Sequence, residues 1–267
     1  MIRLIVSDLD GTLMHDDRSV PARFYQQYRE LQRRGILFVP ASGNQVATMR
    51  HILAPIADEL TFIADNGGLI TRGEEIIYEQ PIPVDALLNS LELLEQYPQC
   101  IKVFNGREGA LIPEADRERA GDALIYLQQH KYVDDLRNHP ENIYKFAIAD
   151  FTGHIAEICA ALRPHLPAGV RLATSGNGWM DVTNENANKG VTVAWLQTHL
   201  GISPDETLAF GVQMNDAVML GRARYSCAMA NCDPNLRAHA RAIAPSNEED
   251  GVVQILDQLL DGTLPLD

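Results

Sequence analysis

The chain opens on a short apolar segment that runs directly into two carboxylates, and this segment limits the fold more than any other. Residues 2–7 have the pattern of a strand, with the apolar run from Leu4 to Val6 at its centre. Asp8 and Asp10 follow at once, and a glycine comes next. A short apolar run closed by Asp and Gly is typical of a buried parallel strand that meets a turn. Because ligands bind at the carboxyl ends of strands in open α/β sheets, we expect both carboxylates at that edge.

The composition is that of a globular chain with a strongly acidic balance. Of its 267 residues, 46% are hydrophobic and 22% are charged, which is enough apolar material for a sizeable core. The net charge of −14 argues against nucleic acid as a partner, because phosphate backbones attract a basic face. No apolar stretch has the length of a membrane span, and no charged leader precedes the first strand. We therefore expect a cytoplasmic protein that binds neither nucleic acid nor a membrane. The sequence does not tell whether the chain has protein partners or which oligomeric state it adopts.

Strand and helix patterns alternate in the first and last thirds of the chain but not in the middle. Strand-like and helix-like segments alternate over residues 1–81 and again over 188–267. Such alternation predicts a parallel sheet. Residues 82–187 mix hairpin-like strand pairs with helices instead. We therefore predict an α/β fold: a Rossmann-like parallel sheet with helices on both faces, split in sequence by an inserted α+β domain.

Two segments near this insert receive specific assignments. Residues 76–83 contain two prolines and are predicted to be an irregular crossing segment. Residues 120–130 are predicted to be helical.

The two carboxylates after the first strand have the chemistry for phosphoryl transfer. Asp8 can attack phosphorus and form an aspartyl-phosphate that water later hydrolyses. Asp10 can protonate the leaving oxygen and then activate that water, if its surroundings raise its pKa. Together the two carboxylates can hold a magnesium ion. The alternative is a plain Asp-Gly turn, because Asp-x-Asp-Gly is common on its own; a calcium loop is excluded, because the later acidic residues are missing.

Two further places can bind an anion. Ser42, Gly43 and Asn44 lie between a predicted strand and a predicted helix, where a hydroxyl and two backbone amides can donate to a phosphate. Ser42 can equally be a simple helix cap. Lys189 precedes the helix that returns to the sheet, and its ammonium can neutralise a phosphate and the attacking carboxylate. The alternative for Lys189 is a solvated surface residue.

A fourth place follows the strand predicted over residues 207–211. Asn215 and Asp216 can bind a metal or the substrate, although Asp216 can equally cap the next helix. Each of the four places is a weak signal alone, but all four fall at carboxyl ends of predicted strands, where they can converge. Together they supply the nucleophile, acid, anion cradle, cation and metal ligands that phosphoryl transfer needs.

These motifs resemble those of the haloacid dehalogenase superfamily over essentially the whole chain, and most closely its Cof-type sugar phosphatases with a type-2 cap. Asp8 and Asp10 match the first motif, Ser42 the second and Lys189 the third. The resemblance implies that residues 82–187 form the cap, that Mg²⁺ is the cofactor and that a small phosphorylated metabolite is the substrate. It also implies these roles: catalytic, Asp8 and Asp10; metal-binding, Asp8, Asp10 and Asp216; phosphate-binding, Thr12, Ser42, Gly43, Asn44, Lys189 and Asn215.

The fourth motif departs from that family at one position. The family pattern Gly-Asp-x-x-Asn-Asp has an aspartate that is expected to bind magnesium, and Val212 stands at that position here. Valine is close to aspartate in size but offers no oxygen, and magnesium is coordinated by oxygen ligands. Because valine is well tolerated in strands, the fold need not suffer. We therefore expect a folded chain with weak magnesium binding and reduced turnover.

The leading hypothesis is a magnesium-dependent phosphatase for small phosphorylated metabolites, most of all sugar phosphates, that works through an aspartyl-phosphate. Its cap would select the substrate with residues 179–181 and 102–107. The alternative is a catalytically weakened protein of the same fold that binds a phosphorylated ligand, which Val212 favours. A phosphomutase would share the same covalent chemistry. The sequence does not indicate which phosphorylated compound is bound.

Overall fold

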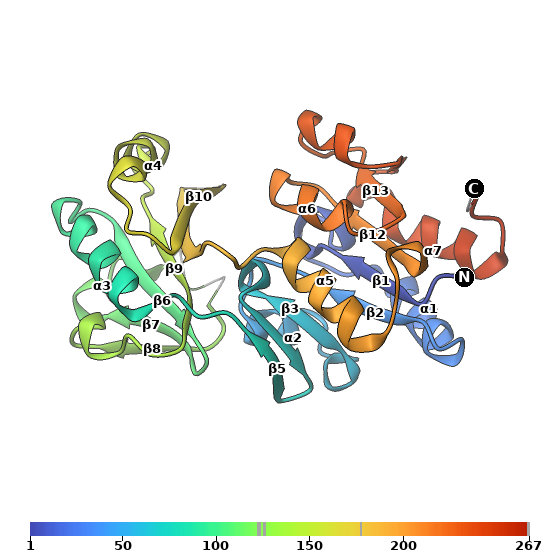
Figure 1. The fold of residues 1–267 in the computed structure, drawn as a ribbon, viewed down its shortest axis with the longest axis horizontal. Coiled ribbons are helices and arrows are strands. Elements are labelled where there is room, and N and C mark those ends of the chain that lie inside the picture. The colour runs from blue at the N-terminus through green and yellow to red at the C-terminus, as the bar shows by residue number, and fades with distance from the viewer. Residues whose placement is uncertain (122–123, 125–126, 177, 266–267) are drawn as a thin grey trace. The chain divides into compact units, whose positions relative to one another are not determined.

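The chain forms two compact units (Figure 1). The computed structural model describes residues 1–121, 124, 127–176 and 178–265. One unit combines residues 1–77 with 188–267, and the other comprises residues 78–187. The sequence interpretation begins the insert at residue 82, and its division into two domains stays a prediction.

The first unit is built on a five-stranded sheet with the order β14-β13-β12-β1-β2, in which every neighbouring pair is parallel. Its strands are β1 (Leu4–Ser7), β2 (Leu37–Pro40), β12 (Thr207–Gly211), β13 (Tyr225–Met229) and β14 (Ala242–Ala244). Strands β1 and β2 come from the first third of the chain, and β12, β13 and β14 come from the last third. This explains why strand and helix patterns alternate in two separate parts of the sequence. The predicted fold class is confirmed.

Strand β1 is a buried interior strand of this sheet, between β12 and β2. Leu4, Ile5 and Val6 are each fully buried, as a continuous apolar run requires when helices cover both faces. The strand pairs with β2 on one side and with β12 on the other. The residue that follows β1 therefore lies at the carboxyl edge of the sheet, between the ends of β12 and β2.

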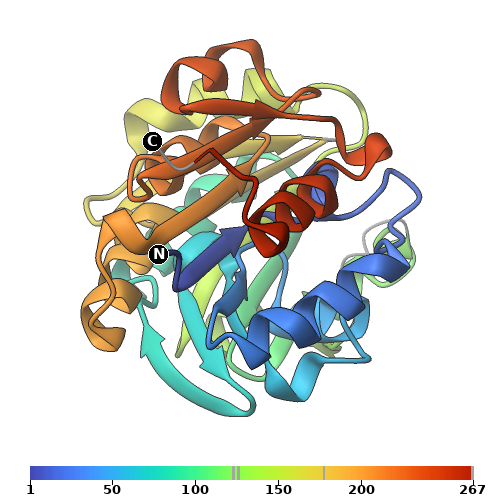
Figure 2. The same cartoon turned by 90° about the vertical axis from the view of Figure 1, so that its right-hand side faces the viewer.

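Helices cover both faces of the first unit. They are α1 (Ala22–Arg33), α2 (Val46–Ile52), α5 (Lys189–Leu200), α6 (Ala217–Leu220) and α7 (Gly251–Asp261). Helix α1 packs against α7, and α5 packs against α6. Figure 2 shows α1 (blue) and α7 (red) on one side of β1 and α5 (orange) on the other. Residues Pro234–His239 form a 3₁₀ helix.

A second, three-stranded sheet completes the first unit and corrects one prediction. Its strands are β3 (Thr61–Ala64), β4 (Leu69–Arg72) and β5 (Glu75–Glu79), with β3 and β4 antiparallel. Residues 76–79 were predicted to be an irregular crossing segment but belong to β5. The two prolines behind that prediction, Pro81 and Pro83, lie beyond the end of the strand and do not interrupt it.

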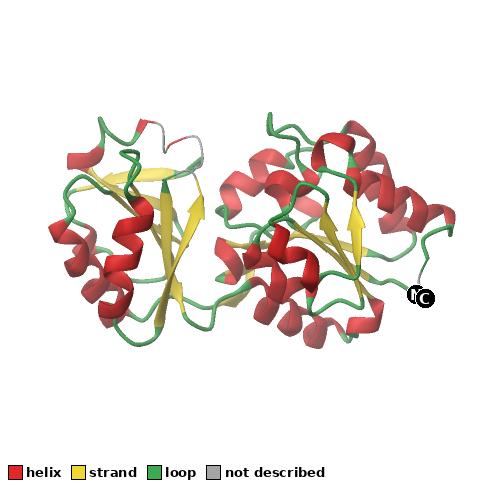
Figure 3. Ribbon diagram, turned by 90° about the horizontal axis from the view of Figure 1, so that it is seen from above, coloured by secondary structure: helices red, strands yellow, loops and turns green. Residues whose placement is uncertain are grey.

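The second unit is a six-stranded sheet with the order β10-β11-β9-β6-β7-β8. Its strands are β6 (Ile101–Gly106), β7 (Gly109–Pro113), β8 (His130–Val133), β9 (Ile143–Ala149), β10 (Val170–Gly176) and β11 (Trp179–Asn184). Helices α3 (Val84–Leu93) and α4 (Ile155–Leu162) pack with one apolar face of the sheet. Figure 3 shows these two helices beside each other along the strands of that unit. The predicted α+β character is confirmed.

The helix predicted over residues 120–130 can be compared with the structure only in part. Residues 122–123 and 125–126 lie outside the described residues. The prediction is wrong at its carboxyl end, since His130 begins strand β8. Strand β8 pairs in parallel with β7, a distant pairing that no local pattern signals. In the described parts of the chain, no helix has the length and apolarity needed to cross a bilayer.

Candidate active site

Asp8 lies where β1 ends, and its side chain is held by two partners. Its backbone N–H donates to the carbonyl oxygen of Phe210 at 3.0 Å, so the pairing with β12 extends to this residue. The Asp8 residue is only 6% exposed. Lys189 Nζ donates to Asp8 Oδ1 at 2.7 Å, and Thr12 Oγ1 donates to Asp8 Oδ2 at 3.0 Å. The carboxylate is therefore fixed in direction at the carboxyl edge of the sheet.

Lys189 bridges two buried carboxylates. Its Nζ also donates to Asp216 Oδ1 at 2.7 Å. The other oxygen of Asp216 accepts from the backbone N–H groups of Val212 and Gln213, at 2.9 and 3.0 Å. Asp216 is fully buried. With three hydrogen bonds on its two oxygens, Asp216 is an anchor for the ammonium of Lys189 and for the turn after β12.

The start of helix α5 sets the position of Lys189. The side chain of Asn188 accepts from the backbone N–H of Val191 at 2.9 Å, which caps the helix one residue before Lys189. Gly67 has φ +93°, and a Cβ on it would lie 2.5 Å from the carbonyl carbon of Asn188. Thr192 Oγ1 donates to the carbonyl oxygen of Gly67 at 2.7 Å. The turn after β3 and the start of α5 thus touch through backbone atoms, and only glycine fits between them.

Replacing Gly67 with alanine is expected to destabilise the chain by about 2–4 kcal/mol, because backbone strain and a clash with Asn188 act together. Gly35→Ala is the matched control. Gly35 also has a positive φ of +70°, but no atom lies within 4 Å of a Cβ built there. It should lose only about 1 kcal/mol. Urea unfolding of both variants measures the difference, and equal losses would refute the close approach at Gly67.

Asp10 forms a second group with the segment after β2. Its Oδ2 accepts from Asn44 Nδ2 at 2.7 Å and from Ser42 Oγ at 3.3 Å. The backbone N–H of Asn44 donates to Ser42 Oγ at 3.0 Å. Ser42 is 1% exposed, whereas Asp10 is exposed. The Ser42 hydroxyl therefore faces the carboxylate of Asp10, and Asp10 is open to solvent.

Sequence reasoning missed Asn66 as a member of this site. Asn66 lies in the turn after β3 with φ +57°, and its backbone N–H donates to the carbonyl oxygen of Ser42 at 3.1 Å. Its Oδ1 accepts from Asn215 Nδ2 at 3.1 Å. A Cβ on Gly43 would lie 3.1 Å from Asn66 Oδ1. The sequence Asp65-Asn66-Gly67-Gly68 is a turn signal, and such a signal does not reveal that its asparagine connects two distant segments.

The structure thus brings the predicted residues into two groups, and the turn after β1 connects one group to the other. Asp8, Thr12, Lys189 and Asp216 form the buried group, and Asp10, Ser42 and Asn44 form the more open one. The tight turn Leu9–Leu13, with Gly11 at φ +71°, connects the two carboxylates. Asn215 joins the second group through Asn66.

The surroundings raise the pKa values of both Asp8 and Lys189 in the buried group, with different consequences for their charge. Burial, followed by the charge of Asp216, raises the pKa of Asp8 to about 7, although Lys189 acts in the opposite direction. Burial disfavours the ammonium of Lys189, but Asp216 and Asp8 outweigh it and raise the pKa of Lys189 above its usual range. Lys189 is therefore always charged near neutral pH, while Asp8 can gain or lose a proton there.

The side chain of Val212 lies against the turn that carries Asp8 and Asp10. It is 4% exposed, and its two methyl groups lie 3.6 and 3.9 Å from the position of a Cβ on Gly11. Hydrocarbon therefore occupies the place beside this turn where the sequence comparison expected a carboxylate. Val212 therefore lies beside the site, and for this reason its departure from the family pattern has a chemical consequence.

The carboxylate oxygens at this site are of the chemical type that magnesium prefers. In the part of the chain that the structure describes, no group of three or more His, Cys, Asp or Glu side chains is arranged to hold a metal. Asp8 and Asp216 both accept from Lys189, whereas Asp10 accepts from Ser42 and Asn44, and the metal-binding role of these three carboxylates stays a prediction. Magnesium keeps several waters and often binds through one or two carboxylates plus a substrate phosphate, and Asp8 with a phosphate can still supply such ligands.

The family model for haloacid dehalogenase-like hydrolases matches residues 5–256 of the chain. The 5-amino-6-(5-phospho-D-ribitylamino)uracil phosphatase YbjI of Escherichia coli (strain K12) is 30% identical over 100% of the chain and 99% of that protein. An HMP-PP phosphatase of Enterobacter sp. (strain 638) is 29% identical over 89% of the chain and 88% of its own length. These relatives are phosphatases that the chain matches nearly end to end.

Solved structures support the fold in the same way. SMU.1108c from Streptococcus mutans UA159 has a TM-score of 0.89 and 27% identity, and the match covers 98% of this chain and 100% of that one. The HAD subclass IIB sugar phosphatase BT4131 has a TM-score of 0.81 and 19% identity, with 96% of this chain and 98% of that one covered. At that identity the second match speaks for the fold alone.

Proposed function

We propose a function for this chain from the premise that it belongs to the haloacid dehalogenase-like hydrolase family, whose model matches residues 5–256. The predicted membership, including the Cof-type group, is confirmed, and the chain is a hydrolase of the phosphatase class. Its proposed reaction is the hydrolysis of small phosphorylated metabolites through an aspartyl-phosphate on Asp8. The observation that carries the proposal is the fixed carboxylate of Asp8 between Lys189 and Thr12 at the sheet edge.

In the first step, Asp8 attacks the phosphorus of the substrate. Two hydrogen bonds hold its carboxylate in one orientation, which lowers the entropic cost of reaching an in-line geometry. Thr12 and Lys189 each take one oxygen of the carboxylate. The bond from phosphorus to the leaving oxygen breaks as the new Asp8 oxygen–phosphorus bond forms.

Asp10 serves as the acid and base of the reaction. Its exposed carboxyl lies two residues after Asp8 in the sequence and is oriented by Asn44 and Ser42. In the acid form it gives a proton to the leaving oxygen, and as a carboxylate it then takes a proton from the water that attacks the aspartyl-phosphate. The same group serves both steps because the first step leaves it deprotonated.

Charge at the phosphate is balanced by donors that the chain supplies and by a metal. The Ser42 hydroxyl, the backbone N–H groups of Gly43 and Asn44, and the Asn215 amide are the proposed phosphate donors, and Lys189 supplies a buried positive charge. Phosphotransferases of the superfamily generally use a divalent metal, typically Mg²⁺. Bound magnesium would neutralise phosphate charge, and Asp8 and Asp10 are the residues of this chain proposed to hold it.

The substrate is proposed to be a phosphorylated sugar or sugar alcohol. The YbjI relative is named a 5-amino-6-(5-phospho-D-ribitylamino)uracil phosphatase, and that name contains a phosphorylated ribityl group. We propose that residues 78–187 serve as the cap that selects among such compounds. The cytoplasmic location expected from the sequence stays a prediction.

One observation favours a second function. In this function the chain binds a phosphorylated ligand but binds magnesium only weakly, and it does not turn the ligand over efficiently. The methyl groups of Val212 replace an oxygen ligand beside the turn of Asp8 and Asp10. A chain that binds inorganic phosphate but releases none from an aryl phosphate would support this second function.

Ser42→Ala is expected to lower kcat/KM for an aryl phosphate in magnesium about tenfold, because one hydrogen bond to the charged phosphate is lost. Phosphate release by the full chain measures this, with Ser19→Ala as the control; Ser19 is exposed and hydrogen-bonds to His15 instead. Equal activity of the Ser42 and Ser19 variants would remove Ser42 from the proposed phosphate site.

A further inference from the structure

The turn that connects the two carboxylates of the proposed reaction is wide and contains a glycine. In the turn Leu9–Leu13, the backbone N–H of Met14 donates to the carbonyl oxygen of Leu9 at 3.0 Å, five residues back. Gly11 lies inside the turn at φ +71°, and Asp10 also has non-helical backbone angles. Because glycine has no Cβ to restrict its backbone, contacts from outside the turn are needed to fix the orientation of its peptide groups.

The side chain of Asn231 supplies such a contact. Its Nδ2 donates to the carbonyl oxygen of Gly11 at 2.9 Å. Its Oδ1 accepts from the backbone N–H of Asn247 at 3.3 Å. One partner is a backbone acceptor and the other is a backbone donor, so the amide can satisfy both in one orientation only. Asn231 therefore links the glycine of the turn to the segment around Asn247.

Sheet topology explains why these two asparagines reach the turn. Asn231 follows the end of β13, and Asn247 follows the end of β14. Strands β12, β13 and β14 run parallel to β1, so their carboxyl ends lie at the same sheet edge as Asp8. The ends of β13 and β14 thus contribute to the edge at which the proposed reaction takes place.

The segment around Asn247 is itself ordered by several hydrogen bonds. Asn247 is 3% exposed, and its Nδ2 donates to the carbonyl oxygen of Met14 at 3.0 Å. Ser246 and Glu249 form a capping box around it, in which Ser246 Oγ donates to Glu249 Oε2 at 2.7 Å. Asn231 is therefore supported by a segment that also holds the carboxyl end of the turn.

The carbonyl group that Asn231 holds lies between two groups of the proposed reaction. Gly11 follows Asp10, the proposed acid and base, and it precedes Thr12, which donates to Asp8 Oδ2 at 3.0 Å. Asn231 is exposed, and a hydrogen bond at an exposed side chain adds little net stability because water competes for both groups. The main effect of this contact is therefore expected in the geometry of the turn.

We infer that Asn231 is a positioning residue for the proposed reaction: through the carbonyl group of Gly11 it fixes Asp10 where it can protonate the leaving oxygen. The inference rests on the proposed function and adds a residue to it. A displacement of about 1 Å in a reacting group can lower the rate as much as about 100-fold. The loss is greatest for a substrate whose leaving oxygen depends most on a proton.

Two substrates with different leaving groups test this role. The 4-nitrophenolate ion leaves without a proton far more readily than the alkoxide of ribose 5-phosphate, so the acid matters most for the sugar phosphate. In magnesium, Asn231→Ala should lower kcat/KM about tenfold for ribose 5-phosphate and only about twofold for 4-nitrophenyl phosphate. Equal losses for the two compounds, or no loss for either, would overturn the inference, because a general defect in folding does not distinguish leaving groups.

Asn235→Ala is the matched control. Asn235 is also exposed and lies close to Asn231 in the sequence, but its Nδ2 donates to Asp233 Oδ1 at 3.0 Å instead of to the turn. This variant should keep the ratio of the two kcat/KM values that the parent chain shows. A change of the ratio equal to that in Asn231→Ala would overturn the inference.

Hydrogen–deuterium exchange measures the hold on the turn without requiring turnover. Peptides that cover residues 9–14 should take up deuterium faster in Asn231→Ala than in the parent chain or in Asn235→Ala. Phosphate release by the parent together with unchanged uptake in Asn231→Ala would overturn only the inference. A parent that releases phosphate from neither compound would overturn the proposed function. Uptake by residues 9–14 would then decide alone: faster uptake in Asn231→Ala would support its hold on the turn, and unchanged uptake would overturn it.

Discussion

Asp8→Asn is expected to abolish phosphate release, with a loss of at least about 1,000-fold, and to make the folded chain more stable above pH 7. The loss follows because an amide cannot act as the nucleophile that the proposed reaction requires. The amide keeps the shape of the side chain and can still meet Lys189 and Thr12. The catalytic loss should therefore occur without loss of fold.

The gain in stability follows from the raised pKa of Asp8. Burial and Asp216 raise this pKa from 3.8 to about 7 in the folded chain. Between these two pH values the folded chain keeps a proton that the unfolded chain has released, so the free energy of unfolding falls as pH rises through this window. Above pH 7 the full penalty is present. Asparagine resembles the protonated acid and avoids that penalty.

Thermal unfolding at two pH values measures this effect. Asp8→Asn should raise Tm by about 5 °C at pH 8, since each kcal/mol corresponds to roughly 2–4 °C for a chain of this size, and the gain should shrink toward pH 4. Asp205→Asn is the control, because the side chain of Asp205 is 73% exposed. A variant that is less stable than the parent at pH 8 would show that the charged form of Asp8 is favourable in the fold.

Val212→Asp is expected to raise magnesium affinity and turnover by about 10- to 100-fold. A carboxylate there adds an oxygen ligand and a negative charge beside the turn of Asp8 and Asp10, where methyl groups now lie. The backbone N–H of Val212 already donates to Asp216, so the new side chain leaves that anchor in place.

The control for this change is Val212→Ala, which removes methyl groups without adding a ligand. Calorimetric titration with Mg²⁺ and phosphate release at rising Mg²⁺ concentration together measure the effect. If Val212→Asp and Val212→Ala behave alike, or if turnover does not rise with the carboxylate, the proposed cause of weak magnesium binding is wrong.

Much of the first unit follows from local sequence patterns. The apolar run before Asp8 is a fully buried strand, as a parallel sheet covered on both faces requires. Helices α1 and α5 begin at local signals, since a proline directly precedes α1 and an asparagine caps α5. These signals lie within a few residues of the elements that they determine.

Errors arose where distant segments determine the structure. Strand β8 is ordered by its pairing with β7, and its own residues carry no clear strand pattern. Strand β5 was missed because the prolines that follow it were given too much weight. At the site, the proximity of Asn66 to Asn215 depends on chain segments 149 residues apart. The roles assigned to Asp8, Asp10 and the phosphate-binding residues stay predictions.

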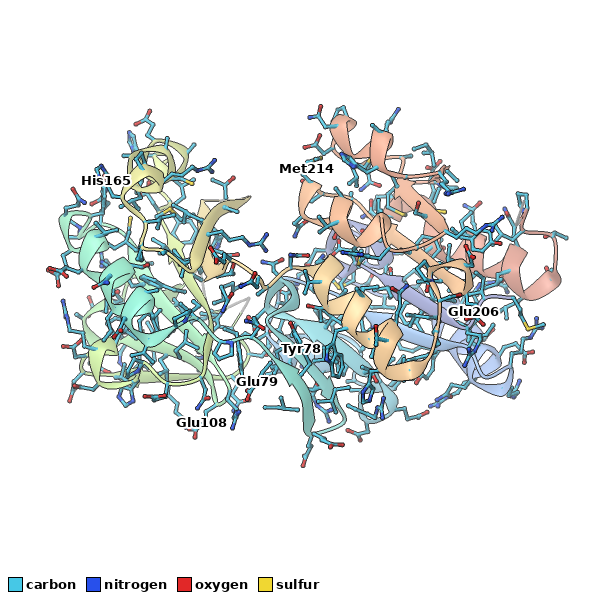
Figure 4. All side chains as sticks on the ribbon, in the orientation of Figure 1. Tyr78, Glu79, Glu108, His165, Glu206 and Met214 are labelled. Atoms are coloured by element: carbon cyan, nitrogen blue, oxygen red, sulfur yellow. The ribbon has the colours of Figure 1, made fainter. Side chains whose placement is uncertain are left out.

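The segment around Val212 carries an exposed apolar residue as well. Met214 lies in the turn between β12 and α6 and is 42% exposed, and Figure 4 labels it among the side chains of the first unit. Single exposed apolar residues are common, so this observation leaves the interpretation of the site unchanged.

The most direct test of the account is mass spectrometry of the chain quenched in acid during turnover of an aryl phosphate in magnesium. We expect the mass of one phosphoryl group on Asp8, and none in Asp8→Asn. A phosphoryl group on another residue, or steady phosphate release with none on Asp8, would contradict the assignment of Asp8 as the nucleophile.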